Sequence, residues 1–347
     1  MPDARPLHPR HGPHRPAAGT PPRRPRSIRR TTTHTSTRPA GLLGDVVISG
    51  VGRDLVTRAE GAAEVVSAAT LDATIAFVED RSVRSIAVWP PMPLDTLIGV
   101  RASGGFRKVL DDALEGTPAG ADRTGSLAYQ LLDEVPTAVL VSGFALAGAG
   151  LHPPRGTFSL DHNADICAGW ARGGTILVEG EALGHVPGVT GPPAPSLDGP
   201  DPLAWHDMGP TPPHTMKRWR RIDVWSSTGE PAGGPVEGPV EVEAFFRDSH
   251  FDAGGQEIVV HEYTVRASLD PASLVFISCI ADIGVLPWVE CPAAAASASR
   301  LAGTPAQDLR SRIRETFVGT STCTHLNDTL RALAAVPHLA EAIRSAH

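Results

Sequence analysis

The chain lacks the motifs that mark nucleotide-dependent enzymes. Its 347 residues contain no Walker loop, no glycine-rich dinucleotide fingerprint after a predicted strand, and neither an HExxH nor a GxSxG motif. We therefore expect no nucleotide cofactor. The formal net charge of -7 has the wrong sign for binding a phosphate backbone, so we do not expect nucleic acid as a partner.

Signatures of membrane spans and of disulfide frameworks are also missing. No apolar run approaches the length that crosses a bilayer, so no membrane partner is expected. The 4 cysteines come without a secretory signal, which favours reduced thiols and a cytoplasmic location. A hydrophobic content of 41% supports a packed core. The expected partner is a small-molecule substrate, and the sequence leaves a homo-oligomer open.

Two stretches of the chain share an order of motifs. Arg29-Arg30 returns as Arg220-Arg221, and Arg53-Asp54 returns as Arg247-Asp248. In each stretch strand patterns come first and helical patterns follow. This order predicts an α+β fold of two tandem pseudo-repeats, each an antiparallel sheet backed by helices.

A long Pro/Gly-rich crossover joins the two stretches, and we expect it to line a cleft between them. The predicted parts are a disordered basic arm rich in Pro and Arg (1–28), a degenerate first repeat (29–136), the crossover (137–216) and a second repeat that carries a Cys/His site (217–347).

Three reactive side chains of the second repeat have no counterpart in the first. Cys291, Cys323 and His325 stand where the first repeat has Met92, Ala128 and Gln130. Thiolate and imidazole are ligands that zinc and iron prefer. Both cysteines precede predicted helices, where exposed amides favour a thiolate. We therefore predict a site in which these three residues bind zinc or iron, with Cys323 and His325 as catalytic groups.

Other polar residues are candidates for the same site. Asp282, at the end of a predicted strand, is a candidate fourth ligand or a partner that orients His325. His261, in another strand, is a candidate general base, with a surface position as the alternative. The crossover offers candidate pocket residues that serve equally as a solvated helix face or as loop anchors, namely His162, Asp165, Trp170, Trp205 and His206.

The second repeat resembles a bacterial family catalogued as domain of unknown function 2889. Members typically open with two arginines and a strand that ends in Arg-Asp, continue to a Cys-Pro and close with Gly-Cys-Thr-His-Leu. The matching residues here are Arg220-Arg221, Val242 to Asp248, Cys291-Pro292 and Cys323-Thr324-His325-Leu326, with Thr322 in place of the glycine. The resemblance covers about residues 217–336 and implies the domain and the three residues, but no activity. In the order of its elements this repeat is also similar to NifU-type iron–sulfur scaffolds, in which Asp, Cys, His and Cys share one metal.

Three functions follow as hypotheses. The first is an enzyme of the lyase or hydrolase type, acting in catabolism on a small apolar or aromatic metabolite through the bound metal; a metal-free variant has Cys323 as nucleophile and His325 as base. The second is a metal or sulfur carrier without a substrate pocket, and the third an interaction protein with incidental thiols. A buried pocket containing Trp170, Trp205 and Cys323 would favour the enzyme.

Overall fold

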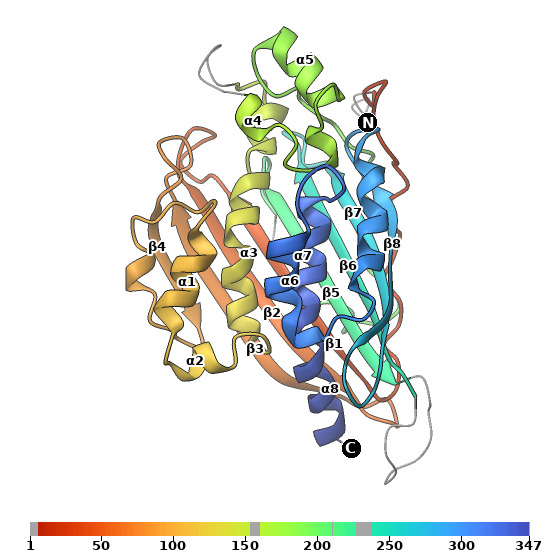
Figure 1. Cartoon of the computed structure of the whole chain (residues 1–347). Coiled ribbons are helices and arrows are strands. Elements are labelled where there is room, and N and C mark those ends of the chain that lie inside the picture. Colours follow the sequence, from red (N-terminus) through yellow and green to blue (C-terminus); the bar gives the residue numbers. More distant parts are fainter. Residues whose placement is uncertain (1–5, 153–159, 210, 227–237, 347) are drawn as a thin grey trace.

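A single antiparallel sheet forms one layer of the molecule. The computed structural model describes residues 6–152, 160–209, 211–226 and 238–346. Eight strands lie in the order β4-β3-β2-β1-β5-β6-β7-β8 (Figure 1). Their bounds are β1 (Ser27–Thr37), β2 (Val46–Thr57), β3 (Ala63–Ile75), β4 (Val83–Trp89), β5 (Met216–Ser226), β6 (Val240–Phe251), β7 (Glu257–Leu269) and β8 (Phe276–Val285).

Helices cover one face of this sheet and form the second layer, so the α+β prediction is confirmed (Figure 1). The α-helices are α1 (Phe106–Leu114), α2 (Pro118–Ala121), α3 (Leu127–Val141), α4 (Phe144–Gly148), α5 (Thr175–Leu183), α6 (Leu309–Thr316), α7 (Thr324–Ala332) and α8 (Val336–Ser345). Short 3₁₀ helices lie at Asp95–Leu97, Asp161–Asn163, Ala168–Trp170, Cys291–Leu301, Ala306–Asp308 and Leu333–Ala335.

The two halves of the chain share one sheet, which corrects the prediction of a separate sheet in each repeat. β1 and β5 pair antiparallel over their length, from Ser27 opposite Trp225 to Ser36 opposite Met216. Pairing satisfies the amides and carbonyls that each strand would otherwise expose at an edge. No cleft therefore separates two modules, and the duplication itself stays a prediction.

The N-terminal arm is ordered over residues 6–26, which corrects the prediction of disorder for its described part. The Arg15 amide donates to the Gly284 carbonyl at 2.9 Å, and the Leu286 amide donates to the Pro13 carbonyl at 2.8 Å. The arm thereby covers the free edge of β8. Its prolines still accept hydrogen bonds through their carbonyls, so a proline-rich segment can serve as an edge cover.

The crossover does not begin at residue 137, because α3 continues through Pro136 to Val141. Its later part first pairs with β7, where the Val259 amide donates to the Pro192 carbonyl at 2.9 Å. Further on, His206 contacts Thr31 and Thr33 of β1, on the face of the sheet opposite α3. Figure 1 shows α4 and α5 at the end of the helical layer. The crossover therefore contributes to both faces of the sheet.

One helical stretch in the described part of the chain, Leu127–Gly148, is long and apolar enough to cross a membrane, and 67% of its apolar 18-residue window is buried inside the protein. Asp133 and Glu134 on this stretch are buried in ion pairs with arginines from other elements. These contacts identify α3 as a core helix.

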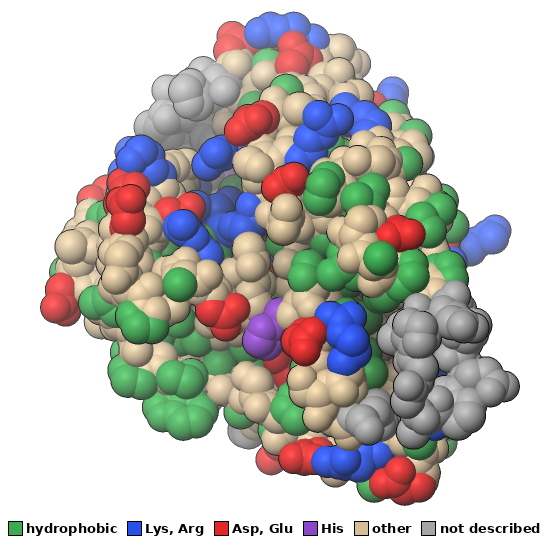
Figure 2. Space-filling model, turned by 60° about the horizontal axis from the view of Figure 1, so that its bottom comes forward, with side chains coloured by type: hydrophobic (Ala, Val, Ile, Leu, Met, Phe, Trp, Pro, Cys, Tyr) green, Lys and Arg blue, Asp and Glu red, His purple; other side chains and the backbone are tan. Residues whose placement is uncertain are grey.

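Acidic and basic side chains are mixed on the face that Figure 2 shows. They occur there in small groups of both signs, between hydrophobic and neutral side chains. The described residues on this face form no extended basic area of the kind that follows a phosphate backbone.

Candidate functional site

An apolar cavity of about 370 Å³ opens at the end of the helical layer. It lies where the end of α3, α4 and the start of α7 meet β7 and the 3₁₀ helix Ala168–Trp170. Its size falls in the range of small-molecule sites. Apolar side chains make up most of the lining, among them Leu140, Phe144, Ile166, Ile176, Val189 and Trp288.

Two histidines form a polar patch in this lining. His261 comes from β7 and His325 from the first turn of α7. Their rings stack with centroids 3.7 Å apart and planes inclined by 20°. Nδ1 of His261 and Nε2 of His325 are buried and have no hydrogen-bond partner among the described residues.

Both unpartnered nitrogens approach one carboxylate oxygen. Oδ2 of Asp248 lies 3.7 Å from Nδ1 of His261 and 3.9 Å from Nε2 of His325. Asp248 is not among the site residues predicted from the sequence. A signal was available, since Asp248 closes the strand motif shared with the family, and its partner across the strands is His261.

Burial sets the protonation of this trio. It lowers the pKa of His325 to about 3 and lowers that of His261 well below its ordinary value. Burial also raises the pKa of Asp248 to about 6, against the opposing effect of Arg218. Both imidazoles are therefore neutral near pH 7, the form that binds a metal or accepts a proton.

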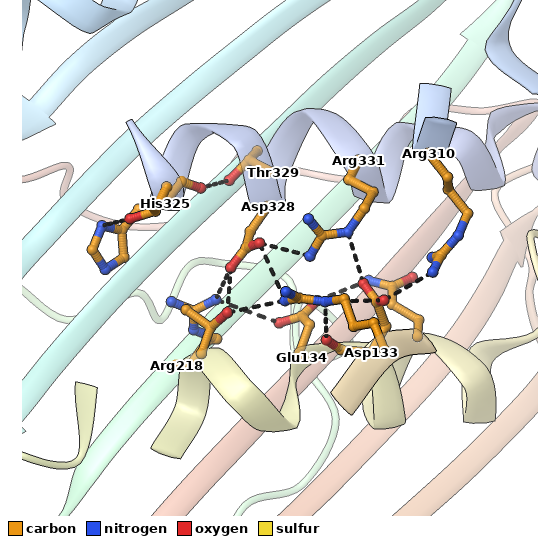
Figure 3. A network of polar contacts seen from close by, with 12 residues as sticks. Asp133, Glu134, Arg218, Arg310, His325, Asp328, Thr329 and Arg331 are labelled. Atoms are coloured by element: carbon orange, nitrogen blue, oxygen red, sulfur yellow. Dashed lines mark hydrogen bonds and ion pairs between the residues drawn. The ribbon is translucent and has the colours of Figure 1, made fainter. Parts of the chain in front are cut away.

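An ion-pair network fixes the carboxylate. Nε of Arg218 donates to Oδ1 of Asp248 at 3.0 Å, and its terminal nitrogen donates to Oδ2 at 2.9 Å. Arg218 also lies 3.4 Å from Asp328 of α7 and 4.0 Å from Glu134 of α3. Figure 3 shows Arg218, Asp328 and Glu134 between α7 and α3, with Arg331 above them. The network ties the sheet to both helices, so the trio has a rigid support.

The predicted cysteines reach the same cavity. Cys323 is the N-cap residue of α7, as predicted, and its Sγ lies 3.9 Å from Nδ1 of His325. Cys291 begins the 3₁₀ helix Cys291–Leu301, and Cys167 joins both in the lining. Burial raises the pKa of all three thiols, that of Cys167 to about 11, so the thiols are protonated near pH 7.

The geometry brings together a set of possible metal ligands that differs from the predicted one. Among the described residues, the group whose ligand atoms all lie within 4.8 Å of one another is Asp248, His261 and His325. It shares His325 with the predicted set and contains no cysteine. Two imidazoles and a carboxylate suit zinc or iron. The lone pair of an imidazole nitrogen lies in the ring plane, so one of the nearly parallel rings must turn before both bind one ion.

The predicted pocket residues of the crossover do not all line the cavity. Trp170 lines the cavity, as predicted. Asp165 is exposed and pairs with Arg172 at 3.1 Å, so the surface alternative holds. His162 lies in the 3₁₀ helix Asp161–Asn163, but its side chain is outside the described residues.

Three further predicted site residues lie elsewhere. The Trp205 ring packs edge-on against Trp219, with centroids 5.3 Å apart, outside the cavity lining. His206 contacts Thr33 of β1 at 2.8 Å through Nε2 and is likewise absent from the lining. Asp282 of β8 is exposed and pairs with Arg266, so it neither orients His325 nor joins the trio.

Residues 216–338 match a family model described as a protein of unknown function (DUF2889). The resemblance given above for residues 217–336 is thereby confirmed. The matched segment runs from β5 into α8 and includes the trio, Cys291 and Cys323. No curated protein and no solved structure matches the chain.

Proposed function

We propose that this protein is an enzyme of the lyase or hydrolase type that acts on a small apolar or aromatic metabolite. Zinc or iron would be held by Asp248, His261 and His325 beside the substrate cavity. The observation that carries the proposal is the apolar cavity of about 370 Å³ with two neutral imidazoles in its lining. A metal or sulfur carrier needs no such enclosure, so the cavity favours the enzyme over the carrier.

Each residue has a physical role in this proposal. The apolar walls bury the body of the substrate and exclude water. His261 and His325 present basic nitrogens near the reacting group, and Arg218 holds the Asp248 carboxylate towards both rings. A bound zinc or iron ion would polarise a carbonyl or lower the pKa of a water molecule.

Metal-free thiol catalysis has less support. A thiol nucleophile needs a thiolate, which an adjacent base or a lowered pKa provides. Here burial raises the pKa of Cys323 and lowers the pKa of His325 to about 3. Proton transfer from this thiol to this imidazole is therefore unfavourable.

Metal content tests the ligand set. Protein purified without chelator is analysed by plasma mass spectrometry, and near-stoichiometric zinc or iron is expected. His261→Gln and His325→Gln should each lose the metal, by at least about tenfold in occupancy. The matched control is His206→Gln, another buried histidine that lies outside the trio and should keep it.

Cysteine variants discriminate the two ligand sets. Cys291→Ala and Cys323→Ala should keep the metal if Asp248, His261 and His325 bind it. Loss of metal in the cysteine variants but not in His261→Gln would instead assign it to Cys291, Cys323 and His325. A wild-type protein without metal would overturn the metal part of the proposal. Turnover of aromatic esters and lactones, lost in His325→Gln and kept in His206→Gln, tests the reaction class.

A further inference from the structure

The cavity lining contains one charged side chain among the described residues, that of Arg81. The described part of this lining contains neither Asp nor Glu, and its other polar side chains are neutral. A single cation in an apolar enclosure is costly unless an anion joins it. The composition of the lining therefore points to a ligand that carries a negative charge.

Among the residues that the structure describes, Arg81 has no counter-ion. No acceptor of these residues bonds its guanidinium, which lies 5.2 Å from the ring centroid of Phe77. Phe77 also lines the cavity. Burial lowers the pKa of Arg81, and the neighbouring Arg101 lowers it further. The guanidinium is thus partly desolvated and available to an incoming anion.

The backbone at Arg81 is an independent observation. Arg81 has a φ of 64°, in the left-handed region that glycine adopts most readily. Strained residues of this kind cluster at sites of function, where the surrounding structure holds them. The turn between β3 and β4 here carries a long cationic side chain where a glycine would be less strained.

We propose that the substrate is an amphipathic carboxylate whose acid group binds Arg81. The apolar body of an aromatic or aliphatic acid then occupies the space between Phe77 and Phe144, and its other end reaches His261 and His325. This inference rests on the proposed function and adds the class of substrate. A planar guanidinium suits a carboxylate because it can donate two parallel hydrogen bonds.

A pair of matched probes tests the inference by calorimetric titration. The probes are 4-phenylbutyrate and the neutral isostere 4-phenylbutanamide, which differ in charge and little in shape. Wild-type protein should bind the acid at least about tenfold more tightly than the amide. Arg81→Met should remove this preference, and Arg81→Lys should keep most of it.

Two further variants make the result specific. Arg81→Gly relieves the backbone strain, so it should fold at least as well as wild type while losing the preference. Arg101→Met removes the neighbouring charge outside the lining and should keep the preference. An amide that binds wild type as tightly as the acid, a preference that survives in Arg81→Gly, or no binding of either probe in the millimolar range would each overturn the inference.

The titration requires neither turnover nor metal. An absent carboxylate preference with metal bound by the trio would therefore reject this substrate class and leave the proposed function standing. A clear preference for the carboxylate in a protein that contains no metal would support this substrate class and overturn the metal part of the proposed function.

Discussion

The imidazole of His261 stacks on that of His325 with ring centroids 3.7 Å apart, although the two come from a strand and a helix. The pair is stable in this arrangement because both rings are neutral. A proton on either ring would place a buried cation beside Arg218, which already lowers the pKa of both histidines. The pair is therefore sensitive to acid.

We predict that acid destabilises the folded protein between about pH 6.5 and pH 4. Burial lowers the pKa of His206 and of His250 to about 4, and that of His325 to about 3. The unfolded chain binds protons first, so the stabilisation is present above the unfolded pKa of about 6.5 and is lost as the pH falls towards the folded values. One such group contributes at most on the order of 3 kcal/mol.

Urea unfolding across this pH range checks the prediction. Asp248 and Glu262 act in the opposite direction, because burial raises their pKa, but the buried histidines with a lowered pKa outnumber them. His206→Gln should reduce the slope of the unfolding free energy with pH. A free energy that does not change between pH 6.5 and pH 4 would contradict the assigned protonation states.

Asp328 should be far more important to stability than an exposed aspartate. It accepts a hydrogen bond from Arg331 at 2.6 Å and another from Thr137 at 2.6 Å, and it lies 3.4 Å from Arg218. Asp328→Asn should cost about 3–5 kcal/mol of unfolding free energy, because it leaves buried arginines with one carboxylate fewer.

The matched control for Asp328→Asn is Asp122→Asn. Asp122 is exposed, so its loss should change the unfolding free energy by no more than about 0.5 kcal/mol. Chemical denaturation of both variants measures the difference. Equal effects would show that the buried network adds little to stability.

The native thiols should react slowly. Burial raises the pKa of Cys167, Cys279, Cys291 and Cys323, which leaves little thiolate near pH 8. Ellman's reagent should therefore titrate the 4 thiols quickly only after unfolding in urea. A native thiol that reacts at once near pH 7, and is absent in Cys323→Ser, would instead support Cys323 as a nucleophile.

Gly169→Ala should disturb the cavity through Cys291. A Cβ at position 169 would lie 2.9 Å from Sγ of Cys291, closer than side-chain carbons normally approach. We expect a loss of about 1–3 kcal/mol of unfolding free energy and weaker ligand binding. Adding Cys291→Ala should restore part of both, a coupling that a double-mutant cycle measures. Gly104→Ala, with open space around its Cβ, is the control and should have little effect.

Local sequence patterns predict most of the secondary-structure elements, but not always whether an element is a strand or a helix. The alternation in β6 and β7 and the turn before α7 were recognisable, because each depends on neighbours in sequence. The apolar start of α5, from Thr175 to Val178, has a pattern that fits a strand as well as a helix. A short apolar run has too few residues for its period to separate the two structures.

Short motifs also give the wrong equivalence between residues of the two halves. Arg29-Arg30 and Arg220-Arg221 look equivalent in sequence because both are arginine pairs. In the sheet, Arg30 donates to Asp54 from the opposite strand, and the arginine placed the same way towards Asp248 is Arg218. Register is set by the packing of whole strands, so a dipeptide alone does not locate it.

The sequence by itself determined the α+β class, the order of strands before helices within each half, and the presence of Cys323 and His325 near the start of α7. Only the tertiary structure decided that β1 and β5 join the halves into one sheet, that His261 and Asp248 complete the group around His325, and that Trp205 and His206 lie away from the cavity. The physical reason is how far apart in the sequence the interacting residues lie. Secondary structure follows from side chains a few residues apart, whereas a site forms where strand register and helix packing bring distant side chains together.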